Sequence, residues 1–243
     1  MPILTRRGRL LLLIALTLAA SCQTAPIGVR WVPDLRQPTP GPGNEVLPLF
    51  QRPFRGNFPL SNHFDHDLPF QFQDTNRYQL TYWGDREYGG VDGHGGHDWR
   101  MPVGTPLLAV ADGEVRTVGT DPPFYCPPLR RTVSDQQFVE VLHQAPGGVR
   151  FSSAVVHVSR IDVNRGERVR AGQPIALSGN TGCSSEPHVH FHVWRFPATN
   201  GGRPARVDPY GWVGAHGPDP WANHSAGARS VWLWKEGEAP ALR

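Results

Sequence analysis

Lysine is almost absent from this chain of 243 residues, which contains only Lys235 and no run of basic residues after position 21. The formal net charge of +3 comes from Arg6, Arg7 and Arg9, because the remaining acidic and basic residues balance. A protein that binds nucleic acid needs a clustered cationic surface to displace the counterions of the phosphates. The sequence therefore argues against a nucleic-acid partner.

Long hydrophobic runs are also missing. The apolar stretch from Leu10 to Ala20 has 11 residues, whereas a helix that spans a membrane needs about 20. Basic residues before this stretch and small residues after it are typical of a secretory signal. We therefore predict a signal over residues 1–21 and an exported protein.

The end of this signal resembles that of a bacterial lipoprotein, in which Cys22 is lipidated and becomes the first residue of the mature chain. This resemblance implies a lipid anchor on Cys22, at the periplasmic face of the outer membrane if the source has two membranes. A soluble secreted form, cleaved close to Cys22, is the alternative.

Proline and glycine divide the rest of the chain. Residues 22–48 are rich in both and have no apolar periodicity, which predicts a tether. Residues 49–88 are rich in aromatic side chains without regular alternation and predict an irregular accessory segment. The tail, residues 201–243, holds four tryptophans, and this density predicts that it packs on the main domain, residues 89–200.

Helical periodicity is absent between residues 102 and 195, where short apolar runs alternate with turn residues. These runs are Leu107–Val110, Val115–Val118, Phe138–Leu142, Val149–His157, Pro174–Leu177 and Val189–Trp194. They predict an all-β fold: an antiparallel sheet or barrel-like sandwich with irregular N- and C-terminal extensions packed on it.

Cysteine is scarce too, since only Cys126 and Cys183 accompany Cys22. An exported chain works in a compartment where disulfides persist. We therefore predict that Cys126 and Cys183 pair, with two separate buried thiols as the alternative.

Histidine, in contrast, is abundant, with eleven residues. In a strand, His188, His190 and His192 would face the same side, and inward imidazoles are costly without a cation or proton donors. Catalytic zinc takes three ligands from His, Asp or Glu and leaves a position for water. His94, Asp98 and one histidine of the 188–190 pair could supply this set. Hydrogen-bonded strand histidines and a separate surface histidine are the alternative.

The sequence has no HExxH motif, so the zinc peptidases that carry their ligands on a helix are excluded. Three other motifs follow one another along the chain. They are His94-Gly95-Gly96-His97-Asp98, Val156-His157-Val158-Ser159 and Pro187-His188-Val189-His190-Phe191. Over residues 90–195 this order resembles the LytM/lysostaphin-type zinc metallopeptidases, whose marks are HxGxD, a middle strand histidine and HxH.

The resemblance implies one zinc ion per chain, held by His94, Asp98 and His190. It implies that His157 and His188 line the site, and we expect them to act as an acid/base pair. The implied activity is hydrolysis of peptide bonds in peptidoglycan stems or cross-bridges by a monomer. Two alternatives are a catalytically silent wall-binding or amidase-activating module and a zinc protease that acts on proteins.

Other polar residues carry weaker predictions. We expect His97 to be structural or exposed and His192 to hydrogen-bond a group behind the ligands. The residues of the segment 180–182 predict a loop near the cleft that binds substrate, or a plain turn. One further polar group consists of His63, Asp65, His66 and Asp67. We expect these residues to be structural or to line the cleft, and a second metal site is the alternative.

Overall fold

The computed structural model describes residues 38–67, 78–197, 204–214, 217–223 and 230–242. The predicted signal, the predicted lipid anchor on Cys22 and residues 22–37 of the predicted tether lie outside these described residues. Nowhere in the described ranges is there a helix with the length and apolar character needed to cross a membrane.

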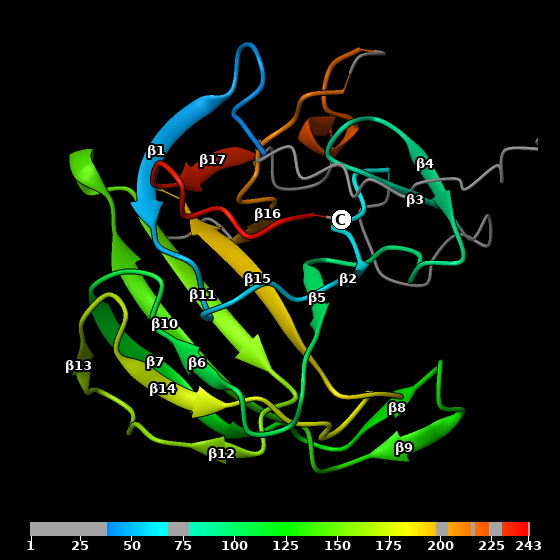
Figure 1. Ribbon diagram of the computed structural model, residues 1–243, viewed down its shortest axis with the longest axis vertical. Helices are drawn as coiled ribbons and strands as arrows, with labels where there is room; N and C mark the ends of the chain where they lie inside the picture. The colour runs from blue at the N-terminus through cyan, green and yellow to red at the C-terminus, as the bar shows by residue number, and fades with distance from the viewer. Residues whose placement is uncertain (1–37, 68–77, 198–203, 215–216, 224–229, 243) are drawn as a thin grey trace, which may run out of the picture. The chain divides into compact units, whose positions relative to one another are not determined.

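The main sheet has eight strands, and each of its strand pairs is antiparallel. Figure 1 shows β15 near its centre, with β5 and β2 on one side and β11, β10 and β7 on the other. In spatial order the strands are β13 (Arg168–Val169), β7 (Gly113–Thr120), β10 (Gln137–Gln144), β11 (Arg150–Val156), β15 (His188–Phe196), β5 (His97–Arg100) and β2 (Leu60–Asn62), with β16 (Ala205–Val207) also paired to β15.

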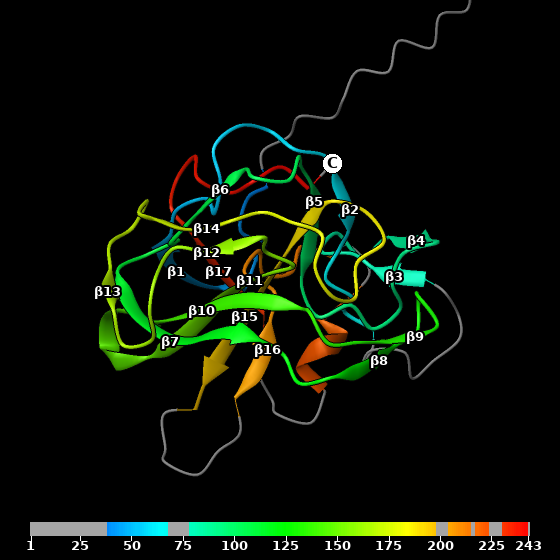
Figure 2. The same ribbon diagram turned by 90° about the horizontal axis from the view of Figure 1, so that it is seen from below.

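Smaller sheets surround the main one, and Figure 2 shows the strands β12, β14 and β6 together as a layer beside β10 and β7. The smaller sheets are β12 (Arg160–Ile161) with β14 (Pro174–Leu177) and β6 (Pro106–Leu108), β1 (Glu45–Phe50) with β17 (Val231–Trp234), β3 (Tyr78–Leu80) with β4 (Arg86–Tyr88), and β8 (Phe124–Cys126) with β9 (Arg131–Val133). The helical elements of the described residues are the 3-10 turns η1 (Pro146–Gly148) and η2 (Pro220–Asn223). The predicted all-β class with antiparallel pairing is confirmed.

The two faces of β15 differ in chemistry because side chains alternate along a strand. Val189, Phe191 and Val193 are buried in the hydrophobic core. The ring centroid of Phe191 lies 5.9 Å from that of Trp234 and 6.4 Å from that of Trp99. The histidines of β15 therefore occupy the opposite face, as the alternation predicted.

Both extensions pack on this core. Trp232 and Trp234 of the tail are buried, and Trp234 also packs edge-on against Phe50 of β1. The strand β1 pairs with β17 in parallel, which differs from the antiparallel pairing of the rest. The predicted end of the tether at residue 48 falls inside β1, because residues from Glu45 onward hydrogen-bond to a strand far along the chain.

The predicted disulfide is confirmed. Cys126 and Cys183 are bonded, with their Cα atoms 5.5 Å apart. The bond joins the end of β8 to the loop that precedes β15. It therefore ties the β8–β9 hairpin to the segment that leads into the strand histidines.

Candidate metal centre in the cleft

His94, Asp98 and His190 bring one ligand atom each into a common space, with all three atoms within 4.8 Å of one another. The Oδ1 atom of Asp98 lies 2.8 Å from His190 Nδ1 and 3.2 Å from His94 Nε2. These two nitrogens are 3.0 Å apart. No other group of this kind occurs among the residues that the structure describes.

Strand pairing and a tight turn create this convergence. Asp98 on β5 lies directly opposite His190 on β15 in the antiparallel register, so both side chains share one face. His94 lies in the turn before β5, where Gly93 has a φ of 68° that favours glycine. The carboxylate of Asp65 accepts a hydrogen bond from the Gly93 amide at 2.8 Å and so holds this turn.

Hydrogen bonds fix which nitrogen of each imidazole is free. His94 Nδ1 donates to the carbonyl of His63 at 2.7 Å, which leaves Nε2 unprotonated. His190 Nε2 lies 3.1 Å from His192 Nδ1, and in the tautomer in which Nε2 is the donor of this pair His190 Nδ1 is unprotonated. Asn62 Nδ2 donates to Oδ2 of Asp98 at 2.8 Å, which leaves Oδ1 facing the two imidazoles. Two lone pairs and a carboxylate oxygen thus point at one another, an arrangement that fits a zinc ion with three protein ligands.

The pKa shifts of the three residues reflect their close contact with one another. Burial alone would raise the pKa of Asp98, but His94 and His190 hold it well below its usual value. Burial would lower the pKa of His94, but the neighbouring carboxylate of Asp98 raises it. Burial lowers the pKa of His190 to about 3 in spite of Asp98. The site therefore carries an ionised carboxylate in a buried position, which a bound cation would compensate.

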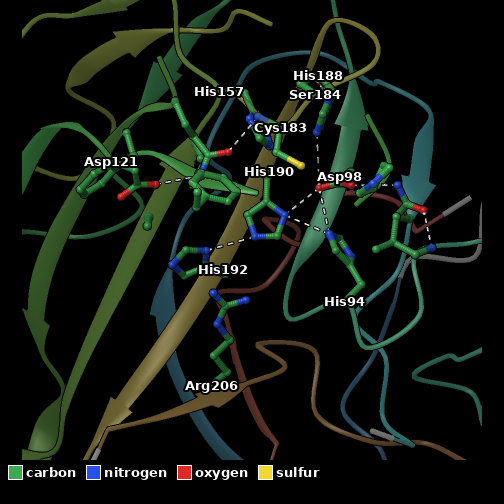
Figure 3. A pocket seen from close by; sticks show the side chains of 18 of the residues that line it. His94, Asp98, Asp121, His157, Cys183, Ser184, His188, His190, His192 and Arg206 are labelled. Carbon is green, nitrogen blue, oxygen red and sulfur yellow. Dashed lines mark hydrogen bonds and ion pairs between the residues drawn. The ribbon is translucent and has the colours of Figure 1, made fainter. Parts of the chain in front are cut away.

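His157 and His188 lie beside this centre, with their ring centroids 4.6 Å apart (Figure 3). His157 follows β11 with a φ of 66°, an uncommon conformation for a residue other than glycine that recurs at functional sites. Its Nδ1 donates to the carbonyl of Thr181 at 2.8 Å, so Nε2 is free. Burial, together with His188, lowers the pKa of His157 to about 4, which keeps the ring neutral at neutral pH.

His188 is oriented by the loop before β15. Its Nδ1 donates to the carbonyl of Glu186 at 2.8 Å and lies 3.0 Å from the hydroxyl of Ser184. Its Nε2 lies 3.8 Å from Oδ1 of Asp98. Both additional imidazoles therefore present an unprotonated Nε2 on the side of the candidate metal centre.

A cleft of about 860 Å³ contains all five of these residues. One wall is the β8–β9 hairpin, with Phe124 and the mostly exposed Tyr125, and the disulfide anchors this wall. The floor is the histidine face of β15, which continues through Trp194 to Phe196. The cleft therefore extends beyond the metal centre along β15 as far as Phe196.

The remaining predicted residues make contacts in the core and around the site. His97 points away from Asp98 into the core, as expected, and its Nε2 lies 3.0 Å from Oδ1 of Asp208. His192 hydrogen-bonds His190, which is one of the three candidate ligands. We expected its partner to be a residue that supports the ligands from behind. Asn180 accepts a hydrogen bond from Ser184 Oγ at 2.6 Å, and the carbonyl of Thr181 accepts from His157.

The four polar residues at 63–67 do not bring their ligand atoms together as a second metal site within the described residues, and several of their polar atoms contact other groups. His63 Nε2 lies 3.2 Å from a carboxylate oxygen of Glu87, and Asp65 accepts hydrogen bonds from backbone amides. His66 binds carboxylates with both ring nitrogens, those of Asp208 and Asp219.

Three residues of the site were missed by the sequence analysis: Asn62, Ser184 and Arg206. Asn62 is adjacent to the polar group at 63–67, and this neighbourhood was the one available signal. Arg206 reaches the cleft only because β16 pairs with β15, and Ser184 acts through its side-chain contacts with His188 and Asn180. No local pattern predicts either.

A His–Asp–His centre beside two further imidazoles, in an open cleft of a β fold, defines the class of zinc-peptidase-like domains. Residues 92–209 match the model of peptidase family M23, and this stretch of the chain belongs to that family. The family that the sequence motifs indicated is therefore confirmed.

Curated relatives match over the same part of the chain. It is 34% identical to peptidoglycan DD-endopeptidase ShyA of Vibrio cholerae over 100 residues, which cover 41% of this chain and 20% of the relative. It is 35% identical to glycyl-glycine endopeptidase ALE-1 of Staphylococcus capitis over 104 residues, which cover 42% and 25%. The chain thus spans a quarter or less of the length of these relatives.

Among solved structures, a zinc containing peptidase from Vibrio cholerae has 24% sequence identity and a TM-score of 0.43. The match covers 67% of this chain and 39% of the other.

Proposed function

We propose that this chain is an exported zinc metalloendopeptidase that hydrolyses peptide bonds in peptidoglycan stems or cross-bridges. The observation that carries the proposal is the convergence of three ligand atoms within 4.8 Å beside two free imidazole nitrogens, inside a domain of family M23. Relatives named as a peptidoglycan DD-endopeptidase and a glycyl-glycine endopeptidase support the choice of substrate.

His94, Asp98 and His190 hold one zinc ion per chain in this proposal. Zinc in such a site polarises a carbonyl group and makes water acidic enough to act as a nucleophile at neutral pH. The chain itself supplies the geometry: His63, His192 and Asn62 fix the orientation of the three ligands through the hydrogen bonds described above.

His157 and His188 share the acid and base roles. One free Nε2 accepts the proton of the attacking water, and a protonated imidazole of the pair then donates to the leaving amine. The hydrogen bonds to the carbonyls of Thr181 and Glu186 keep the Nδ1 protons in place and so leave each Nε2 available. Once one Nε2 of the pair is protonated, it can also donate to the carbonyl oxygen as negative charge develops there.

The proposed location of the enzyme rests on the sequence of residues 1–22. A signal over residues 1–21 directs export, and lipidation of Cys22 anchors a monomer to the cell envelope. The Pro-rich segment that follows separates the catalytic domain from the membrane. Anchoring of this kind concentrates the enzyme near peptidoglycan. The sequence itself shows no recognisable repeat that binds this polymer.

The test is incubation of residues 23–243, loaded with zinc, with purified peptidoglycan, followed by mass spectrometry of the released fragments. New peptides derived from cross-links, absent after chelation and absent with His157→Ala, support the proposal and identify the bond. Intact peptidoglycan combined with retained zinc would favour a binding module, or a protease with a protein substrate.

A further inference from the structure

Arg206 projects from β16 into the cleft beside the candidate metal centre (Figure 3). In the antiparallel pair of β15 and β16 it lies opposite Trp194, two residues beyond His192, and so shares the histidine face. Its guanidinium carbon lies 5.0 Å from the centroid of the Trp194 ring. Stacking on this ring holds the planar group in one orientation.

Gly95 provides the space for this guanidinium. A Cβ atom at position 95 would lie 2.2 Å from Arg206 Nη1 and 2.7 Å from Cδ, so the side chain packs directly on the backbone there. Gly95 immediately follows His94, one of the proposed zinc ligands. The cation is therefore held against the turn that carries a ligand, at the side of the centre away from His157.

The charge of Arg206 has no counterion within the described part of the chain. The other arginine of the cleft, Arg116, contacts both carboxylate oxygens of Glu140, at 2.9 and 3.0 Å. Asp121, also in the cleft, accepts a hydrogen bond from Gln136. Burial lowers the pKa of Arg206 to about 10, so the guanidinium remains charged at neutral pH. A partly buried charge of this kind is costly until an anion pairs with it.

We propose that Arg206 binds a free carboxylate of the substrate, carried by a residue next to the scissile bond. The inference rests on the proposed function and adds a substrate class to it: peptides with a carboxylate at the cross-link, in preference to neutral oligoglycine bridges. A guanidinium offers two parallel N–H donors that match the two oxygens of a carboxylate. Such a contact places the peptide so that its scissile carbonyl lies at the metal centre.

The experiment uses two series of cross-linked peptides, one with the carboxylate at a chain end and one with it on a side chain. Each is made as the free acid and as the amide, and the two series distinguish the sources of the carboxylate. We expect the zinc-loaded mature chain to cleave one free acid with a kcat/KM about 10–100-fold above that of its amide. Equal rates for acid and amide in both series would overturn the proposal.

Variants assign this preference to the residue. Arg206→Gln should remove the difference in kcat/KM between acid and amide, mainly through KM. Arg206→Lys should keep part of this difference, because it retains the positive charge but lacks the two parallel N–H donors. Arg160→Gln, which removes an exposed arginine paired with Asp162, is the matched control and should keep the full preference. An equal loss on acid and amide in Arg206→Gln would contradict a carboxylate contact.

Binding separates this inference from the proposed function. Calorimetry with His157→Ala compares the acid and amide peptides, with and without Arg206→Gln. If the wild type cleaves no peptide, the proposed function fails, yet tighter binding of the acid that is lost in Arg206→Gln still supports the contact. Equal binding of acid and amide overturns the contact, whether or not cleavage occurs.

Discussion

His97 and Asp98 are neighbours on β5, but they belong to two clusters on opposite faces of the strand. The cleft cluster consists of His94, Asp98, His157, His188 and His190. The buried cluster consists of His66, His97, Asp208 and Asp219. Both contain imidazoles and carboxylates in contact, so residue type alone does not distinguish them.

The difference lies in where the nitrogen lone pairs point. In the buried cluster His66 contacts Asp208 at 3.0 Å and Asp219 at 2.8 Å, so both ring nitrogens face carboxylate oxygens. Burial alone would lower the pKa of His66, but Asp219 and Asp208 raise it to about 9. A charged imidazole between two carboxylates is a cross-link, and neither ring nitrogen of His66 is free to bind a metal ion. In the cleft cluster one carboxylate meets several imidazoles whose outer nitrogens already donate elsewhere, and the inner lone pairs can bind a cation.

Removing the single carboxylate of the cleft cluster should have the largest effect. We expect Asp98→Ala to lose bound zinc and to lower kcat/KM at least about 10⁴-fold, because both the Lewis acid and the activated water are lost. Metal analysis and peptide hydrolysis measure the two quantities. Retention of one zinc per chain would show that the two clusters do not differ as described.

His157→Ala sharpens the comparison within the cleft cluster. We expect kcat to fall about 10²–10⁴-fold with zinc retained, because the variant removes an acid/base group and no ligand. His190→Ala, measured in parallel, should lose zinc as well as activity. If the His157 variant loses zinc and the His190 variant keeps it, the roles that we assign are reversed.

Asp208→Asn tests the buried cluster. Breaking a buried ion pair typically costs about 3 kcal/mol of the free energy of unfolding, and we expect this loss at pH 6 with zinc binding unchanged. Because the pKa of His66 is raised from 6.5 to about 9 on folding, its stabilisation is complete below pH 6.5 and disappears as the pH rises through about 9.

Urea unfolding of the wild type and Asp208→Asn from pH 6 to pH 10 measures this effect. The difference in unfolding free energy between the two proteins should shrink towards pH 10. A constant difference over this range would mean that His66 is not charged in the folded protein.

Asn62→Ala should have the smallest effect, since it removes a residue that contacts the carboxylate and not the metal. We expect zinc affinity to fall about 10–100-fold, because Asp98 Oδ2 loses the donor that orients it. Competition with a chelator measures the affinity. The neighbouring Ser61→Ala, whose hydroxyl contacts only the backbone carbonyl of Asp98, is the control and should bind zinc as the wild type does.

The sequence predicted the histidine face of β15 because strand periodicity is local: His188, His190 and His192 are two residues apart, whatever surrounds them. The partners of residues 63–67 could not be predicted in this way. His66 binds Asp208, which is 142 positions away, and Glu45 of β1 pairs with Val231 of β17. Such pairs depend on the path of the whole chain, and so does the position of Arg206.

The last residues of the chain set a practical limit on how the catalytic domain can be cut. Trp99 Nε1 donates to the carbonyl of Ala241 at 3.0 Å, Tyr210 donates to that of Pro240, and Leu242 is buried. A fragment limited to residues 92–209 would lack β1, β2 and β17 and would expose the aromatic surface that they cover. Exposed apolar surface of this kind promotes aggregation. Crystallisation and limited proteolysis should therefore start from a fragment that keeps residues 38–242 together.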